Sequence, residues 1–427
     1  MSSAALWPVI EVVMNFVPYA IPFFLLFIMI EVLWGWLKGN NTYRVNDSIN
    51  SLSLGLLSTI SKFVFLNIGL LVFSRVEQHY AIWAFDSRSI AHWFAAILLY
   101  DFLYYWFHRI SHERQLFWGS HVVHHQSEDY NLSTALRQTS TSFLTTWVFY
   151  IPCFLLGMPI SMFVSIASAH LIYQFWVHTQ HIGKLGMLEW FLVTPSNHRV
   201  HHAQNADYID TNYGGVLIIW DRAFGTFQEE HEEQKPIYGI RTALTSWNPL
   251  WANLHIFTRM AQDAWRTASW LDKVRILWSK TGWRPQDVAA RYPSNTTDLD
   301  NFKKYNPSLS AQSNCAIIAQ YALLSLFYLW SANQVDALSY GLLWGTVITQ
   351  VYSLIVIGAI MDRKSYAKRL EQTRLIVLST GLYASFALNH IPLQWFYYGL
   401  TYLVASAILM WFCITSDTDV SLATRSS

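Results

Sequence analysis

Long apolar runs constrain the fold of this chain more than any other feature of its sequence. About 20 predominantly apolar residues suffice for a helix to cross a bilayer. The composition agrees, since 53% of the 427 residues are hydrophobic and 13% are charged, against about 25% charged in soluble domains. We therefore expect an all-α, polytopic membrane bundle rather than a soluble protein. The apolar runs lie near residues 9–37, 50–74, 90–107, 142–178, 314–333, 340–361, 373–390 and 394–414.

The distribution of polar residues divides the chain into three parts. Residues 1–178 predict a membrane bundle, in which the run at 142–178 makes two segments that meet at Gly157-Met158-Pro159. Residues 179–310 are more polar and predict a cap with amphipathic helices, and four further spans follow from about residue 314. In functional terms, we expect a catalytic domain at 1–240, a cytoplasmic helical connector at 241–310 and additional C-terminal transmembrane helices at 311–427.

The basic residues of the short loops predict the orientation of the chain. Lys38 and Arg44 follow the first run, and five Lys and Arg residues crowd the loop and helix start at 363–374. Because such residues concentrate on the cytoplasmic side, both loops and the polar cap are expected there. The first run lacks the features of a cleaved signal peptide, so we expect it to be retained. These expectations describe a multi-pass protein of the endoplasmic reticulum in a eukaryote, or of the inner membrane in a bacterium.

Three histidine clusters interrupt the apolar sequence between residues 108 and 202. They read His-Arg-Ile-Ser-His, His-Val-Val-His-His and His-Arg-Val-His-His, and they hold eight of the 16 histidines. Spacings of three and four residues place side chains on one face of a helix. Three helical faces can therefore direct eight imidazoles toward one point. The cluster histidines are His108, His112, His121, His124, His125, His198, His201 and His202.

The number and type of these side chains predict a site for two metal ions. Eight imidazoles exceed the three or four protein ligands that a single ion such as zinc takes. Neutral imidazole suits iron, copper, nickel and zinc, whereas a site lined by nitrogen alone suits magnesium and calcium poorly. His178 is a ninth candidate, because it ends an apolar run that meets the same surface. His170 and His181 are lesser candidates.

Two acids beside the clusters are candidates for a supporting role. Metal-bound histidines usually donate their second ring proton to a carboxylate, a carbonyl or water. Asp101 precedes His108 by two helical turns inside an apolar run, where an acid is costly and usually functional. Glu113 directly follows His112. We therefore assign Asp101 and Glu113 to the catalytic machinery.

A polyhistidine site beside membrane spans suits the oxidation of a lipid C–H bond, with the lipid held among the spans. Oxygen activation requires a redox metal, which favours iron. The net charge of +1 gives no indication of a nucleic-acid partner. Cys153, Cys315 and Cys413 are far apart in the sequence, so neither a disulfide framework nor a cysteine metal site is expected.

The order His-x3-His, His-x2-His-His, His-x2-His-His among membrane runs resembles the fatty acid hydroxylase and sterol desaturase superfamily. Within it, the chain is similar to the alkylglycerol monooxygenase family, strongly over about 100–240 and weakly at both ends. The additional C-terminal runs also fit that family. The similar passages are Tyr105-Trp-Phe-His-Arg-Ile-Ser-His-Glu113, Tyr130-Asn-Leu-Ser-Thr-Ala-Leu-Arg-Gln138, Tyr173-Gln-Phe-Trp-Val-His-Thr179, Thr194-Pro-Ser-Asn-His-Arg-Val-His-His202 and Asn212-Tyr-Gly-Gly-Val-Leu-Ile-Ile-Trp-Asp-Arg-Ala-Phe-Gly-Thr-Phe227.

This resemblance implies a membrane-bound di-iron monooxygenase that uses O2 and tetrahydrobiopterin. It implies hydroxylation of the ether-linked carbon of an alkylglycerol, after which the product collapses to a fatty aldehyde and glycerol. It also implies that the eight cluster histidines and His178 bind iron, with Glu113 as an accompanying acid. One departure is Asn197, where the animal enzyme has a further histidine. No short motif marks a pterin site, so the cofactor-binding residues stay unassigned.

Two other functions remain open at this stage. The first is a hydroxylase or desaturase of a sterol, fatty acid or aminolipid that receives electrons from a cytochrome or ferredoxin. The second is a metal transporter or sensor in which the histidines form a transit site. Transporters place their ligands at mid-membrane between repeated halves. Here the clusters flank the apolar runs and no repeat is evident, which disfavours the second function.

Overall fold

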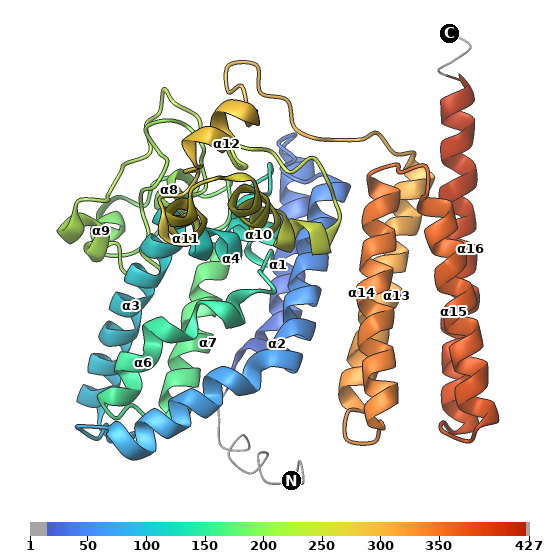
Figure 1. Ribbon diagram of the computed structural model, residues 1–427, viewed down its shortest axis with the longest axis horizontal. Helices are drawn as coiled ribbons and strands as arrows, with labels where there is room; N and C mark the ends of the chain where they lie inside the picture. Colours follow the sequence, from blue (N-terminus) through green and yellow to red (C-terminus); the bar gives the residue numbers. More distant parts are fainter. Residues whose placement is uncertain (1–14, 424–427) are drawn as a thin grey trace. The chain divides into compact units, whose positions relative to one another are not determined.

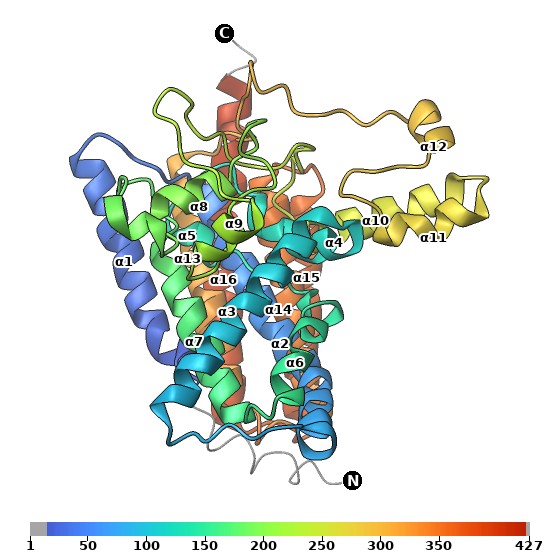
Figure 2. The same ribbon diagram turned by 90° about the vertical axis from the view of Figure 1, so that its left-hand side faces the viewer.

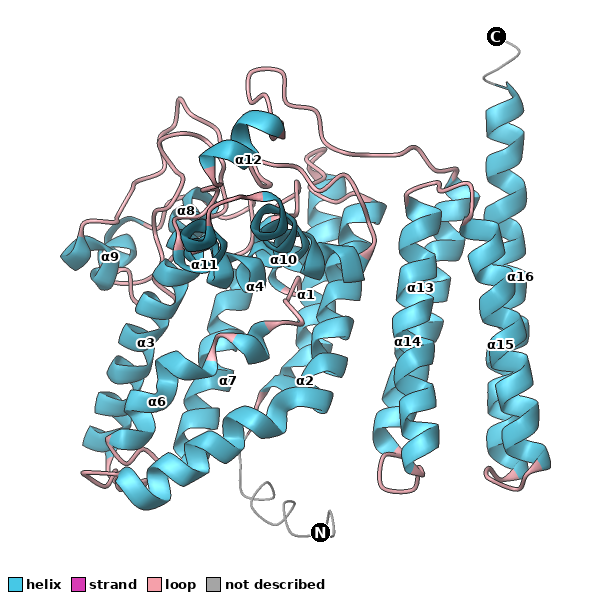
Figure 3. Ribbon diagram, viewed as in Figure 1, coloured by secondary structure: helices cyan, strands magenta, loops and turns pink. Residues whose placement is uncertain are grey.

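The computed structural model describes residues 15–423, without the side chains of 63–68 and 412–423. Over this part of the chain the regular structure is helical, and only isolated β-bridges occur (Figure 3). Helices are expected in a membrane because they satisfy every backbone hydrogen bond within one segment. The predicted all-α membrane bundle is therefore confirmed, whereas the predicted orientation stays a prediction.

Five helices are long and apolar enough to cross a membrane: Val17–Leu37, Ile90–Glu113, Ala311–Asn333, Tyr340–Met361 and Leu393–Trp411. The run at 142–178 forms two helices, as predicted, and both are shorter than these five: α6 (Trp147–Leu155) and α7 (Ile160–Trp176). They meet at Gly157 as predicted. Its φ is +77°, and a Cβ atom at this position would collide with the backbone carbonyl of Trp83, so only glycine fits there.

The chain divides into two compact units. The first comprises the chain up to Tyr43, Ser61–Leu244 and Asn253–Phe302, and the second comprises Arg44–Ile60, Thr245–Ala252 and the chain from Lys303 onward. Helix α2 (Val45–Tyr80) begins in the second unit and ends in the first. The functional division into 1–240, 241–310 and 311–427 stays a prediction.

The first unit is built on α1 (Val17–Leu37), α3 (Ile90–Glu113), α6 and α7. Helices α6 and α7 both pack on α3, and α1 packs on α7. The core between α3, α6 and α7 contains Tyr100, Phe154, Met158 and Phe163. At one end of α3 and α7 lie the short helices α4 (Gln115–His125) and α8 (Pro195–His201), which bear histidines of the second and third clusters (Figures 1 and 2).

The short segments of this unit follow in chain order, and all lie outside the five candidate spans. They are α4 (Gln115–His125), α5 (Leu132–Ala135), η2 (Ser142–Leu144), η3 (Gly186–Trp190), α8 (Pro195–His201), α9 (Ile219–Phe224), α10 (Pro249–Arg266), α11 (Trp270–Trp278) and α12 (Gln286–Arg291). One of them, α10, begins in the second unit and continues in the first.

The second unit contains four long helices: α13 (Ala311–Asn333), α14 (Tyr340–Met361), α15 (Ala367–Ala387) and α16 (Leu393–Ala423). Helix α13 packs on α14 and α16, and α15 also packs on both. A buried ion pair between Arg374 and Glu371 lies inside this unit, with a shortest distance of 2.8 Å. The guanidinium also donates to Ser353 and Tyr402, so its hydrogen-bonding groups are satisfied within the bundle.

Candidate metal centre

The first two histidine clusters meet because the chain turns between α3 and α4. His108 and His112 lie in the last turns of α3, and His121 opens the second cluster on α4. Arg114 separates the two helices with an extended backbone, at φ −124° and ψ 128°. One non-helical residue ends α3 and changes the chain direction before α4, and the two helices pack together.

The third cluster lies on α8, which begins at a well-defined cap. Thr194 accepts a hydrogen bond from the backbone N–H of Asn197, and Pro195 occupies the first helical position. Both features are strong signals for the start of a helix. His198 and His201 lie within α8 and His202 is its C-cap. His178 comes two residues after α7 ends, so four segments, α3, α4, α8 and the end of α7, reach the same place.

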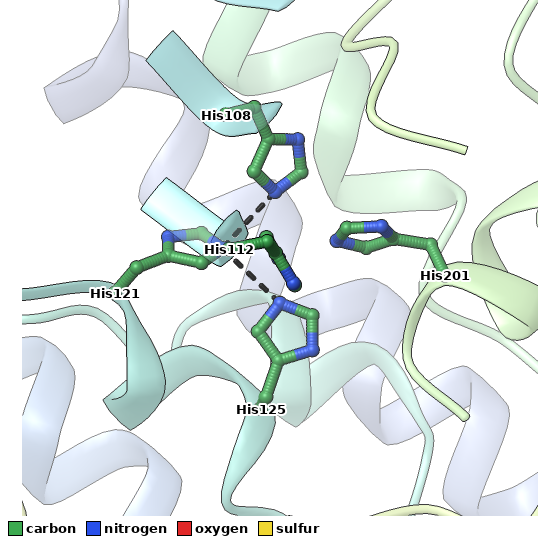
Figure 4. A group of neighbouring side chains, drawn as sticks. All are labelled: His108, His112, His121, His125 and His201. Carbon is green, nitrogen blue, oxygen red and sulfur yellow. Dashed lines mark hydrogen bonds between the residues drawn. The ribbon is translucent and has the colours of Figure 1, made fainter. Parts of the chain in front are cut away.

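The histidine side chains form two groups rather than one. Within each group, one ligand atom from each residue lies within 4.8 Å of those of the others. The first group contains His108, His112, His121, His125 and His201, which approach one another from α3, α4 and α8 (Figure 4). The second group contains His124, His178, His198 and His202.

This partition differs from the expectation that each cluster aims at one point. His121 and His125 belong to the first group, whereas His124, adjacent to His125, belongs to the second. Likewise, His201 belongs to the first group and His202 to the second. Successive helical residues point about 100° apart, because the helix has 3.6 residues per turn. Each His-x2-His-His cluster therefore contributes to both groups, and the imidazoles of His125 and His202 stack at 4.3 Å between them.

Backbone carbonyls fix the tautomer of four of these histidines. The Nδ1 atoms of His108 and His201 lie 2.7 and 2.9 Å from the carbonyl oxygens of Tyr213 and Thr211. A carbonyl can only accept a hydrogen bond, so the ring proton must be on Nδ1. The Nε2 atom of each ring then carries a lone pair that points into its group. The same holds for His124 and His178, which bond to the carbonyls of Arg137 and Gln174 at 3.0 and 2.7 Å.

This arrangement fits bound cations. The Nε2 atoms of His124 and His178 are 3.2 Å apart, and both carry lone pairs, so neither can donate to the other. A positive ion between them removes the repulsion. In the first group, the Nε2 atoms of His112 and His201 are buried without a hydrogen-bond partner. Such buried orphan atoms are rare unless a ligand satisfies them. A donor set of nitrogen atoms alone is consistent with iron.

The surroundings keep the imidazoles neutral, as metal binding requires. Burial, reinforced by neighbouring histidines, lowers the pKa of His121 and His202 well below the usual range. Burial also lowers the pKa of His124 to about 4. Burial likewise lowers the pKa values of four further histidines well below the usual range: His125, His178, His198 and His201.

Asp101 is buried, but it bonds to a loop and to His170 rather than to a histidine of either group. Its carboxylate accepts from the backbone N–H groups of Val216 and Leu217, at 3.0 and 3.2 Å, and from the indole of Trp220. The Nε2 atom of His170 lies 2.7 Å from Oδ1 of the same carboxylate. Asp101 thus supports the loop that supplies the Tyr213 carbonyl to His108.

A second buried acid, Asp221, holds the other side of that loop and was missed from the sequence. It accepts from the backbone N–H groups of Tyr213 and Gly214, both at 2.7 Å, and from the Thr226 hydroxyl. Burial raises the pKa of Asp221 to about 6. One sequence signal for Asp221 was available: it follows Trp220 in the Asn212–Phe227 passage, which is similar to the alkylglycerol monooxygenase family.

Glu113 lies outside both histidine groups. It pairs with Arg109 at 2.8 Å, and 36% of its side chain is exposed. The acid near His112 is instead Asp210, whose carboxylate is 3.7 Å from the Nδ1 atom of that histidine. Asp210 follows the third cluster by eight residues in an irregular segment with a positive φ of 59°. Nothing in the local sequence pattern marks it.

The Tyr130–Gln138 passage packs around the second group. The Tyr130 ring stacks on His178 with a centroid distance of 5.6 Å, and its hydroxyl donates to the Val177 carbonyl. Arg137 is buried and donates to the Val123 carbonyl at 2.8 Å, while its own carbonyl accepts from His124. The passage therefore holds His124 and His178 in place.

The remaining sequence candidates lie elsewhere. His170 bonds to Asp101, and His181 belongs to neither group. Asn197 is buried and donates to the Leu192 carbonyl at 3.3 Å, so it stabilises the start of α8. Cys153 and Cys315 are free cysteines, and the side chain of Cys413 lies outside the described residues.

Comparison with known proteins agrees with this geometry. The sequence model of the fatty acid hydroxylase family matches residues 93–226, which include all nine histidines. Human alkylglycerol monooxygenase is 35% identical over 370 residues, covering 86% of this chain and 82% of the human protein. The chain belongs to the alkylglycerol monooxygenase family. The zebrafish alkylglycerol monooxygenase is 34% identical over 373 residues, with the same coverage of both chains.

Membership of the alkylglycerol monooxygenase family makes the chain a membrane-bound oxidoreductase of the lipid-hydroxylating kind, for which iron is the consistent metal. An ornithine lipid hydroxylase of Rhizobium tropici is also similar, at 29% identity over 145 residues, covering 34% of this chain and 44% of that protein. No solved structure gives a significant match.

Proposed function

We propose that this chain is a di-iron monooxygenase that hydroxylates the ether-linked carbon of alkylglycerols. The observation that supports it is the presence of nine imidazoles in two adjacent groups at the end of a membrane helix, in a chain whose relatives are named alkylglycerol monooxygenases. One oxygen atom of O2 enters the C–H bond and the other leaves as water, with two electrons and two protons from a reduced tetrahydropterin such as tetrahydrobiopterin. The resulting hemiacetal collapses to a fatty aldehyde and glycerol.

The residues that would hold the two iron ions are the two histidine groups. Bound there, iron supplies the redox chemistry that activates O2. The five-histidine group and the four-histidine group differ in donor number, so the two ions would have different surroundings. Backbone carbonyls and the Tyr130–Gln138 passage orient the imidazoles before any ion binds. Such outer partners usually tune ligand basicity and metal affinity.

The placement of the site suits a lipid with an apolar chain and a polar head. Helix α3 has 24 residues, so it is about 36 Å long at 1.5 Å per residue, against about 30 Å for the bilayer interior. His108 and His112 lie in its last turns, near the level where the hydrocarbon ends. An ether bond between an alkyl chain and glycerol lies at that level. We propose that this end faces the cytoplasm, at the endoplasmic reticulum or inner membrane, as the basic loops predict.

Glu113 and Asp101 have different proposed roles. Glu113 is accessible and its carboxylate is paired with Arg109, so this pair can bind a polar group of the substrate or of the reductant. Asp101 is a positioning residue, because it acts on His108 through the 213–217 loop. The residues that bind the pterin stay unassigned.

The test is product analysis with the full chain in proteoliposomes. A 1-O-alkylglycerol is supplied under O2 with tetrahydrobiopterin, with a reduced ferredoxin system, or with neither, and the fatty aldehyde is measured. We expect aldehyde with the pterin, and none from a His121→Ala variant that has lost iron. Iron-loaded protein that releases no aldehyde under any reductant would exclude this substrate.

A second candidate is hydroxylation of a different membrane lipid, favoured by the similarity to an ornithine lipid hydroxylase over 145 residues. It predicts a different product, because an oxygen added away from an ether bond leaves a stable hydroxyl group. Lipid extracts of cells with and without the chain distinguish the two. A hydroxylated lipid with an unchanged carbon skeleton would support the second candidate. Loss of ether lipid with release of fatty aldehyde would support the first.

A further inference from the structure

Helix α11 exposes its apolar side chains, which is the reverse of what a water-facing helix does. Trp270 is 81% exposed and Val274 is 69% exposed. Leu271, Leu277 and Trp278 are exposed as well. These positions are three, four and seven residues apart, so they form one continuous stripe along the helix. Trp265, at the end of α10, extends the apolar surface.

Two charged side chains of α11, those of Asp272 and Lys273, are less exposed than the stripe. Lys273 donates to the carbonyls of Ala264 and Thr267, at 2.6 and 2.8 Å, at the end of α10. Asp272 and Lys273 are both partly buried and Ile276 is buried, whereas the apolar residues of the stripe are exposed. A contiguous apolar surface of this kind marks a contact with another molecule or with a membrane.

The segment that follows α11 attaches it to the turn between α3 and α4. The backbone N–H of Gln115 donates to the Ser279 carbonyl at 3.0 Å. The backbone N–H of Thr281 donates to the Glu113 carbonyl at 3.2 Å. Because Glu113 is the last residue of a candidate membrane span, α11 lies level with the end of that span.

The direction of α11 also fits a position along a membrane surface. In both ribbon views, α10 and α11 run crosswise to α3 and α7, at the end that bears the histidines (Figures 1 and 2). A helix that lies across the end of a spanning helix is parallel to the membrane plane. Its apolar stripe can then enter the boundary between headgroups and acyl chains.

The charges of this region match a phospholipid surface. Residues 264–280 contain four cations, Arg266, Lys273, Arg275 and Lys280, and one acid, Asp272. Tryptophan together with Lys and Arg is typical of helices that lie in the membrane interface. Of these cations, Arg266, Arg275 and Lys280 are exposed, and such long basic side chains can reach phosphates while their stems stay near the apolar stripe.

We propose that α11 and the adjoining end of α10 form an interfacial surface whose apolar stripe lies in the phospholipid bilayer that α3 crosses. The surface holds the turn between His112 and His121 at the depth of the lipid headgroups. It does not depend on the bound metal or on the substrate, so it stands apart from the proposed activity.

Spin-label depth measurements in proteoliposomes test this proposal. The full chain, with its three cysteines replaced, is labelled at Val274→Cys on the stripe. Two matched controls are labelled in the same background. Glu232→Cys, in an exposed loop of the cap, reports water, and Phe23→Cys, 60% exposed on α1, reports the bilayer interior. Collisions with O2 and with a water-soluble nickel chelate give the depth of each label.

We expect the label at Val274 to be shielded from nickel and to lie about 5–10 Å below the headgroup level, as for interfacial helices. A label as accessible to nickel as that at Glu232 would overturn the proposal. Dipolar broadening that shows a second copy of the chain at Val274 would also overturn it, in favour of a protein interface. All three labels are at exposed positions, so folding is expected to be preserved, and retained iron content checks it.

Discussion

Replacing His178 with glutamine tests the division of the histidines into two groups. His178 is one of four ligand candidates in the second group and has no place in the first. Glutamine keeps an N–H that can donate to the Gln174 carbonyl, but it removes the Nε2 lone pair. We therefore expect His178→Gln to release one metal ion and to leave the other bound.

The size of the effect follows from the ligand count. Loss of an outer partner alone usually weakens metal binding about 10–100-fold. Loss of one of four direct donors should exceed this range, so we expect binding at least about 100-fold weaker, or about 2.7 kcal/mol at 1.36 kcal/mol per tenfold. His181→Gln, three residues further on and outside both groups, is the matched control.

Iron content per chain, with competitive chelation to measure affinity, decides the outcome. In the proposed arrangement the content falls from about two ions to about one in His178→Gln and is unchanged in His181→Gln. Two ions bound with unaltered affinity would refute the ligand role of His178. Loss of both ions from a protein that still melts cooperatively would refute the independence of the two groups.

Three further predictions concern pH, packing and the second group. Burial lowers the pKa of His124 to about 4, whereas a histidine in the unfolded chain titrates near 6.5, so the metal-free protein is most stable above pH 6.5. Its melting temperature should therefore fall as the pH is lowered from 6.5 to 4. A melting temperature that does not change over this range would contradict the prediction. Gly215→Ala places a Cβ atom against the His170 ring and should lower the melting temperature. Gly183→Ala is the control, because it has open space around it and should leave the melting temperature unchanged. Equal melting temperatures for the two variants would show that the loop around Gly215 can move to accommodate the Cβ atom. Arg137→Lys should weaken binding of one metal ion about 10–100-fold, as measured by chelation, and leave the other unchanged; an equal loss at both ions would point to a general effect on the fold.

Much of the candidate site could be predicted from residue spacing alone. Histidines three and four apart lie near each other on a helix whatever surrounds them, so the clusters were visible before any tertiary structure. The eight cluster histidines and His178 are the nine that the structure gathers into two groups, whereas the lesser candidates His170 and His181 lie outside both. The supporting residues were harder to find, because Asp221 and Asp210 reach the site through loops that no periodic pattern describes.

The apolar runs alone were enough to specify an all-helical membrane protein, because such runs have few other stable forms in lipid. Helical spacing likewise identified the side chains that are candidates for binding metal together. Two outcomes came instead from the packing of separate segments: Asp101 supports a loop instead of a ligand, and α11 exposes its apolar stripe. Neighbours in space that are distant in sequence leave no mark on local periodicity, which is why no pattern in the chain could reveal them.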